Sequence, residues 1–263
     1  MIRIDCQGLS GSDLSDTEQV KGAYDCLVKN GYAILDHVVP VETIASLLVE
    51  FYERYPRYLA EERAEDTLEV GDRRSLVPIQ FAGRFADPLI YANPAVVAVA
   101  RLALSETAIL ETYGAVVSSP GADKQHIHRD APLLFDSAIA PMLPAHALNF
   151  ALPLVEMNEL HGSTTLWPGS HRWPKRNDEA ASQTPVIPVG SCILWDYRLF
   201  HSGTANRSTR HRPFVYATYA RRWYQDPVNF EEGERRRLTF ADGFLSSVPE
   251  TLRKLFSHVG QAP

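Results

Sequence analysis

The sequence predicts a mostly β fold with flanking helices, in which an antiparallel sandwich or barrel is supported by helices on one side. Segments with helical periodicity occupy the first third of the chain. From residue 108 the segments are β-branched and aromatic, and Pro, Gly, Asn and Ser separate them. Helices that precede strands in this way do not suggest alternating βα units. No repeat, low-complexity tract or linker divides the 263 residues, so we expect one domain over 1–263, with its β core at about 105–225.

The first expected helix follows the N-terminal segment. Ser15 and Glu18 have the spacing of a capping box, which satisfies free N–H groups at a helix start. Gly31 is a typical helix stop, because it adopts the left-handed conformation without strain. The short apolar run YAILD, at 32–36, then predicts a strand.

Three further helices are expected. The segment 40–55 places apolar residues at helical spacing. The segment 93–104 begins with Asn93 as N-cap and Pro94 at the first helical position, where its missing N–H has no consequence. A short helix at 248–259 ends the predicted order.

Four strands are expected in the second part of the chain. Each is apolar, rich in β-branched or aromatic residues and bounded by turn residues. They lie at 108–119, 146–157, 188–196 and 212–223.

Composition excludes several classes of function. The net charge of −6 gives no electrostatic reason to expect nucleic-acid binding. No apolar run reaches the roughly 18 residues of a membrane span, and the N-terminus lacks the features of a secretion signal. Cys6, Cys26 and Cys192 are odd in number and form no CxxC pair, so we expect reduced thiols in a cytoplasmic protein.

The stretch KQHIHRDAPLLF, at 124–135, carries the strongest sign of chemistry. If the chain is extended there, His128 and Asp130 point to the same face, because residues two apart in a strand do so. An imidazole and a carboxylate side by side are two of the three ligands in the facial triad that binds non-heme Fe(II). The pair alone is weak evidence, since an H-x-D occurs often by chance.

A third ligand and an anion partner can be found further along the chain. His201 follows the apolar strand CILWD and can reach the edge of a neighbouring strand. Arg212 opens the next strand, and a guanidinium can hold a carboxylate with two parallel hydrogen bonds. A buried arginine near a metal is costly unless an anion meets it. A dicarboxylic cosubstrate that chelates the metal and reaches Arg212 would satisfy both sites.

The order of these motifs resembles the phytanoyl-CoA dioxygenase family. The chain has PG-x-x-x-Q-x-x-H-x-D ending at Asp130, then HGSTTLWPGSHRW at 161–173, then H-x(4)-N-x(5)-R from His201. The segments 29–48 and 85–96 are also similar to the family. The resemblance implies a double-stranded β-helix (a jelly-roll, cupin-like barrel). It also implies an oxygenase that uses Fe(II), 2-oxoglutarate and O2.

Site residues follow from the resemblance by position. It implies His128, Asp130 and His201 as iron ligands and Arg212 as the partner of the distal carboxylate of 2-oxoglutarate. Family members that halogenate have a small residue where this chain has Asp130. The resemblance therefore favours hydroxylation of a C–H bond of a small organic metabolite, with release of succinate and CO2.

Three more residues match positions near the cosubstrate. Gln125 and Thr164 correspond to residues that hydrogen-bond 2-oxoglutarate in related proteins. Asn149, on the expected strand at 146–157, can also face it.

Alternatives remain open at this stage. His126 lies two residues before His128, so the two could form the H-x-H of a cupin-type metal site. Arg210 would share a strand face with Arg212 and could take its place. A barrel that binds a small molecule or a metal without turning over 2-oxoglutarate is the alternative function. A small-molecule substrate is expected as partner, with no nucleic acid and no membrane.

Overall fold

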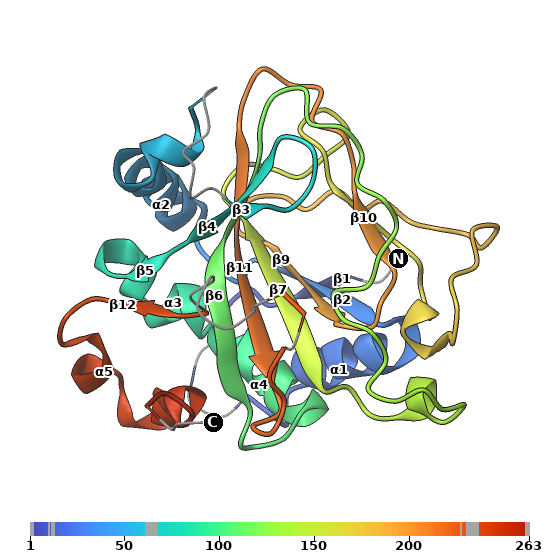
Figure 1. Cartoon of the computed structure of the whole chain (residues 1–263). Coiled ribbons are helices and arrows are strands. Elements are labelled where there is room, and N and C mark those ends of the chain that lie inside the picture. The colour runs from blue at the N-terminus through green and yellow to red at the C-terminus, as the bar shows by residue number, and fades with distance from the viewer. Residues whose placement is uncertain are drawn as a thin grey trace.

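The fold is built on one large, mostly antiparallel sheet (Figure 1). The computed structural model describes residues 3–9, 11, 14–60, 68–226, 228–229 and 237–260. In this sheet the strands lie in the order β1-β2-β9-β7-β11-β6-β4-β3. Their bounds are β1 Arg3–Asp5, β2 Tyr32–Asp36, β3 Leu68–Glu69, β4 Arg74–Pro78, β6 Ile109–Ser118, β7 Ala147–Pro153, β9 Cys192–Asp196 and β11 Arg212–Ala220.

Two short strand pairs, five α-helices and five 3-10 helices complete the described elements. β8 (Thr164–Leu166) pairs antiparallel with β10 (His201–Gly203), and β5 (Gln80–Phe81) pairs parallel with β12 (Thr239–Phe240). The α-helices are α1 Glu18–Asn30, α2 Val41–Arg54, α3 Pro88–Tyr91, α4 Pro94–Ala103 and α5 Phe244–Ser247. The 3-10 helices are η1 Pro56–Tyr58, η2 Gly83–Ala86, η3 Ala140–Met142, η4 Ser170–Arg172 and η5 Glu250–Phe256. No helix among the described residues is long and apolar enough to span a bilayer.

The caps of the helices decide where they begin and end. The predicted capping box at Ser15 is wrong: α1 begins two residues later, because the Thr17 hydroxyl accepts the N–H of Val20. Gly31 ends α1 in the left-handed conformation, as predicted, with φ of 81°. The Asn93 side chain caps α4 ahead of Pro94, also as predicted.

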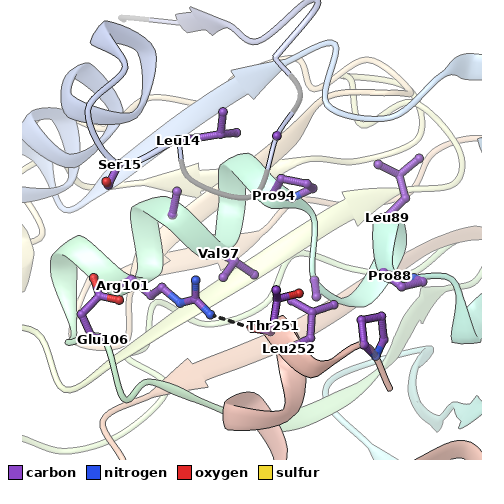
Figure 2. A pocket seen from close by; sticks show the side chains of 14 residues that line it. Leu14, Ser15, Pro88, Leu89, Pro94, Val97, Arg101, Glu106, Thr251 and Leu252 are labelled. Carbon is purple, nitrogen blue, oxygen red and sulfur yellow. Dashed lines mark hydrogen bonds between the residues drawn. The ribbon is translucent and has the colours of Figure 1, made fainter. Parts of the chain in front are cut away.

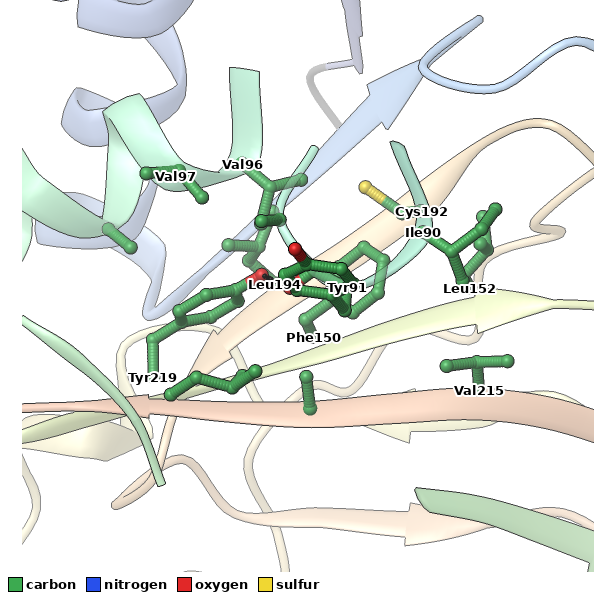
Figure 3. Close-up of a cluster of buried hydrophobic side chains, with 14 of the residues drawn as sticks. Ile90, Tyr91, Val96, Val97, Phe150, Leu152, Cys192, Leu194, Val215 and Tyr219 are labelled. Atoms are coloured by element: carbon green, nitrogen blue, oxygen red, sulfur yellow. Dashed lines mark hydrogen bonds between the residues drawn. The ribbon is translucent and has the colours of Figure 1, made fainter. Parts of the chain in front are cut away.

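The two faces of the large sheet have different neighbours. On the outer face, side chains of β6, β7, β9 and β11 pack against the helices in one apolar cluster. Figure 3 shows this packing, with Tyr219 of β11 close to Tyr91 and Val215 of the same strand on the side of Leu152. The Tyr219 hydroxyl donates to the Tyr91 carbonyl (2.6 Å). Most of the buried apolar side chains among the described residues belong to this cluster. Burial of apolar surface stabilises a fold by roughly 25 cal/mol per Å². In Figure 1, α2 and β10 lie on opposite sides of β6, β11 and β7.

The second layer of the fold is small and irregular. β8 and β10 are three residues each, and isolated bridges extend them, with His128 opposite His201 and Leu166 opposite Gln183. Leu166 of this layer packs with Ile34, Ala151 and Ile193 of the large sheet, so the layer covers part of the inner face. It carries two of the candidate metal ligands.

The structure corrects and extends the expected elements. All four strands predicted after residue 108 form, as β6, β7, β9 and β11. The expected helix at 248–259 is instead the 3-10 helix η5. Besides the predicted β2, three strands from the first 78 residues, β1, β3 and β4, join the large sheet, so its strands extend beyond the expected 105–225. Cys6, Cys26 and Cys192 are free and buried.

Candidate metal centre

The structure brings His128, Asp130 and His201 together. Their candidate ligand atoms all lie within 4.8 Å of one another. His201 Nε2 is 3.5 Å from Asp130 Oδ1, and the rings of His128 and His201 are 4.3 Å apart between centroids. Two imidazoles and one carboxylate grouped in this way form a facial set that leaves positions open on a metal ion.

Main-chain hydrogen bonds hold the three residues in register. His128 N–H donates to the His201 carbonyl (3.0 Å), and His201 N–H donates back to the His128 carbonyl (2.9 Å). The N–H of Asp130 donates to the Tyr197 carbonyl (3.2 Å). The segments that contain His128 and His201 are far apart in sequence, and an antiparallel bridge between these two residues brings them together.

Each histidine presents the nitrogen that a metal needs. His128 Nδ1 lies 2.9 Å from the His126 carbonyl, and His201 Nδ1 lies 3.0 Å from the Leu199 carbonyl. A carbonyl only accepts, so Nδ1 carries the proton and the Nε2 lone pair is left for a ligand bond. Burial, together with the nearby His201, lowers the pKa of His128, which favours the neutral form.

The carboxylate of Asp130 is oriented by two donors. Its Oδ2 accepts hydrogen bonds from Asn149 Nδ2 (2.9 Å) and Trp195 Nε1 (3.0 Å). The Thr218 hydroxyl donates to Asn149 Oδ1 (2.6 Å) and so fixes that amide. These contacts leave Oδ1 facing His201. Asn149 was expected to face a cosubstrate; its side chain lines the cavity and is bonded to Asp130.

Arg212 lies in the same cavity as the three residues, which has a volume of about 680 Å³. The side chain is 2% exposed, and its Nε and Nη1 have no hydrogen-bond partner among the described residues. Burial, with the nearby charge of Arg74, lowers the pKa of Arg212 to about 9, so it remains a cation at neutral pH. A buried cation with unused donors is costly unless an anion binds there.

Arg74 is a site feature that sequence reasoning missed. It lies opposite Ser118 on one side of β6, and Arg212 lies opposite the same residue on the other side. Arg74 Nη2 donates to the Thr204 carbonyl (2.6 Å), while its Nε has no partner among the described residues. Two buried guanidinium groups thus flank one end of the cavity. The only sequence signal is the arginine pair at 73–74, which reads as a charged turn.

The two other predicted cosubstrate residues also line the cavity. Gln125 is held by the protein, since its Oε1 accepts Gly203 N–H (3.0 Å) and its Nε2 donates to the Val70 carbonyl (2.5 Å). One Nε2 hydrogen remains for a ligand. Thr164 is buried on β8, next to β10.

The alternative residues are placed differently. His126 is exposed, and in the described part of the chain the group able to hold a metal does not include it. Arg210 is exposed, whereas Arg212 is buried in the cavity. The structure thus assembles His128, Asp130 and His201 with Arg212 and not the neighbouring frames.

A second hollow of about 690 Å³ lies away from these residues (Figure 2). Leu14, Leu89, Val97 and Leu252 line it, and Arg101 donates to the Thr251 carbonyl across it (3.2 Å). It contains none of the candidate ligands. The candidate ligands all line the cavity at β10 and β11.

Comparison with known proteins agrees with the resemblance in the motifs. Residues 27–214 match the family described as phytanoyl-CoA dioxygenase (PhyH). The chain belongs to the phytanoyl-CoA dioxygenase family. It is 30% identical over 104 residues to the multifunctional dioxygenase prhA of Penicillium brasilianum, covering 35% of each chain. It is 32% identical over 102 residues to the dioxygenase cdmD of Talaromyces verruculosus, covering 35% of this chain and 33% of that one. This phytanoyl-CoA dioxygenase family member thus matches about a third of the length of these curated relatives.

Solved structures establish the fold as a double-stranded β-helix. The epimerase SnoN in complex with Fe3+, alpha ketoglutarate and nogalamycin RO superimposes with a TM-score of 0.61 at 19% identity, over 85% of this chain and 96% of SnoN. HygX from Streptomyces hygroscopicus, with nickel and 2-oxoglutarate bound, gives a TM-score of 0.62 at 14% identity, over 84% and 96% of the two chains. The predicted jelly-roll fold is confirmed.

Proposed function

We propose that the protein is an Fe(II)- and 2-oxoglutarate-dependent dioxygenase that hydroxylates a C–H bond of a small organic metabolite and releases succinate and CO2. The observation that carries the proposal is one cavity that contains both a possible metal site and a possible anion site. The cavity contains a facial set of two imidazoles and a carboxylate, and also the buried Arg212, whose Nε and Nη1 have no partner among the described residues. We also propose that residues 1–263 work as one domain.

The donor set fits ferrous iron. Two neutral imidazole nitrogens and one carboxylate oxygen, from His128, Asp130 and His201, match the ligand types of non-heme Fe(II) oxygenases. The hydrogen bonds at each Nδ1 and at Asp130 Oδ2 fix the ligand atoms before a metal arrives. When bound, the iron supplies the oxidising chemistry with O2 and 2-oxoglutarate.

The other end of the cavity fits a dicarboxylate. Arg212 can pair with a carboxylate through two parallel hydrogen bonds, and Arg74 adds a second positive charge beside it. Gln125 and Thr164 are further donors for the cosubstrate. An acid with a second carboxylate near the metal would use both ends at once, as 2-oxoglutarate does.

The side chains that line the cavity would bind and orient the substrate and exclude water from it. Leu76, Val116 and Phe214 form apolar walls of the cavity on the side of the large sheet. These three side chains are only partly buried, so a substrate in the cavity could contact them. The relatives named as dioxygenases support oxidation, and the epimerase SnoN has the same fold. Product mass therefore belongs in the test.

The test is succinate release from 2-oxoglutarate under air with Fe(II), comparing wild type with His201→Ala. We expect release from the wild type that rises with a suitable metabolite, and release at the level of enzyme-free solution from the variant. A product heavier by one oxygen identifies hydroxylation, and an unchanged product mass contradicts it. Equal release from the two proteins would contradict the proposed function itself.

A further inference from the structure

The buried side chain of Asp226 organises a short turn that follows β11. The residue is fully buried, and its carboxylate accepts four hydrogen bonds. Oδ1 accepts the main-chain N–H groups of Val228 (2.8 Å) and Asn229 (3.0 Å). Oδ2 accepts the Tyr197 hydroxyl (2.5 Å) and Asn229 Nδ2 (2.8 Å). Because the carboxylate accepts all four hydrogen bonds, it fixes both the main chain of the turn and the plane of the Asn229 amide.

The Asn229 amide connects this turn to the metal loop. One hydrogen of its NH2 group goes to Asp226, and the other goes to the main-chain carbonyl of Asp130 (2.7 Å). This bond restrains the peptide that follows Asp130. The Asp130 N–H is already held by the Tyr197 carbonyl (3.2 Å), and its carboxylate is held by Asn149 and Trp195. Both peptide groups of the candidate ligand are therefore fixed, one through the Asp226 turn.

The turn is anchored in the sheet by Glu111. This residue lies in β6 where the pairing with β11 shifts register, and it is 2% exposed. Its Oε1 accepts the N–H of Asp226 (3.3 Å) and a guanidinium hydrogen of Arg237. Arg237 in turn donates to the Asp226 carbonyl (2.6 Å), and its own carbonyl accepts the N–H of Tyr113. Residues on both sides of the turn are thus tied to one carboxylate.

The turn also reaches the cavity. Val228 and Asn229 line the same space as the candidate ligands, and Val228 is half exposed. The side chains that fix the metal loop and those that bound the substrate space therefore belong to one segment.

We propose that Asp226 and Asn229 are positioning residues of the metal centre, in which Asp226 holds the Asn229 amide and that amide holds the main chain of Asp130 in the geometry that binds metal. The inference rests on the proposed function for the identity of the metal. It assigns to residues outside the family's motifs a role in the affinity of the site.

The test uses Co(II) as the metal probe, titrated calorimetrically into wild type, Asn229→Ala, Asp226→Ala and the double variant. Residues that support a metal ligand are typically worth 10–100-fold in metal affinity. We expect the Kd for Co(II) to be about tenfold higher in Asn229→Ala, and at least tenfold higher in Asp226→Ala. The double variant should match Asp226→Ala, because coupled residues are not additive. Asn177→Ala is the matched control, since Asn177 is an exposed asparagine that also caps a turn.

A readout without metal separates this inference from the proposed function. Amide hydrogen exchange at Asp130 in the metal-free protein should be faster in Asn229→Ala and unchanged in Asn177→Ala. If the wild type bound no Co(II), the proposed metal site would be wrong. The exchange rates would still test whether Asp226 and Asn229 hold the main chain of Asp130. A folded Asn229→Ala with wild-type Kd and wild-type exchange would overturn the inference. Additive losses in the double variant would show that Asp226 does not act through Asn229.

Discussion

The two faces of β11 differ in what their polar groups meet. On the outer face, Val215, Ala217 and Tyr219 are fully buried against the helices, and the Tyr219 hydroxyl has its partner. On the inner face, Arg212 has two nitrogens without a partner among the described residues, and Thr218 supports the amide that orients Asp130. One strand of nine residues thus carries a satisfied face and an unsatisfied one.

The difference separates stability from function. An unsatisfied buried polar group costs about 1–3 kcal/mol, and more when it is charged. A fold that only needed to be stable would not keep Arg212 in this state. Substitutions on the outer face should therefore reduce stability and spare cosubstrate binding, and those on the inner face should do the reverse.

The largest effect is expected at the metal ligands. Asp130→Ala removes a ligand atom, so succinate release should fall by more than about 100-fold, beyond the range typical of residues that only support a ligand. The melting temperature should fall by only a few degrees, because the side chain lines the cavity and, among the described residues, only Asn149 Nδ2 and Trp195 Nε1 lose an acceptor. Asp136→Ala, six residues along at an exposed position, is the control and should keep its activity.

The next effect is expected at Arg212. Arg212→Lys keeps the charge but loses the planar pair of donors, so KM for 2-oxoglutarate should rise about tenfold or more. Arg212→Leu should raise the melting temperature of the ligand-free protein, because it removes an unpaired buried cation. Arg210→Lys, at the exposed neighbouring position, should leave KM unchanged. An unaltered KM in Arg212→Lys would remove the assignment of the anion site.

A third prediction concerns the outer face. Leu152, on β7 opposite Val215, is fully buried in the helix-facing cluster shown in Figure 3. Leu152→Ala should lower the free energy of unfolding by about 2–5 kcal/mol, measured by denaturant titration. KM for 2-oxoglutarate should remain that of the wild type. A shift in KM comparable to that of Arg212→Lys would break the division between the faces.

The smallest effect is expected at Glu111, which holds the Asp226 turn, and it is a dependence of stability on pH. Burial raises the pKa of Glu111 to about 7, against the opposing effect of Arg237. A pKa raised on folding means that the folded state binds the proton more tightly, so this group's contribution to stability is lost as pH rises from about 4.5 through 7. The melting temperature should fall by a few degrees over that window, and Glu111→Gln should flatten the dependence. A steeper fall in Glu111→Gln would contradict the assigned direction.

Sequence reasoning succeeded where one local rule decides the structure. The spacing of two residues correctly placed His128 and Asp130 on one side, and strand composition correctly gave β6, β7, β9 and β11. Asn93 and Gly31 have side-chain or backbone properties that few other residues share, so both helix ends were predictable.

The remaining features depend on tertiary contacts. Ser15 and Thr17 both carry a hydroxyl and lie two residues apart, so the sequence alone does not distinguish them as caps of α1; in the structure the Thr17 hydroxyl accepts the N–H of Val20. In sequence Arg74 has the pattern of a charged turn, but in the structure it is the first residue of β4. Its burial follows from the pairing of β4 with β6, which are far apart in sequence. The pair Asp226 and Asn229 has no sequence motif, because its partners come from four separate segments of the chain. These partners are Tyr197, Glu111, Asp130 and Arg237.

The most direct test of the account is an anaerobic Fe(II) titration in the presence of 2-oxoglutarate, following the visible charge-transfer band of a ferrous ion chelated by a 2-oxo acid. The wild type should bind one equivalent and show the band, His126→Ala should do the same, and Asp130→Ala should show neither. A band that persists in Asp130→Ala, or that disappears in His126→Ala, would contradict a centre built from His128, Asp130 and His201.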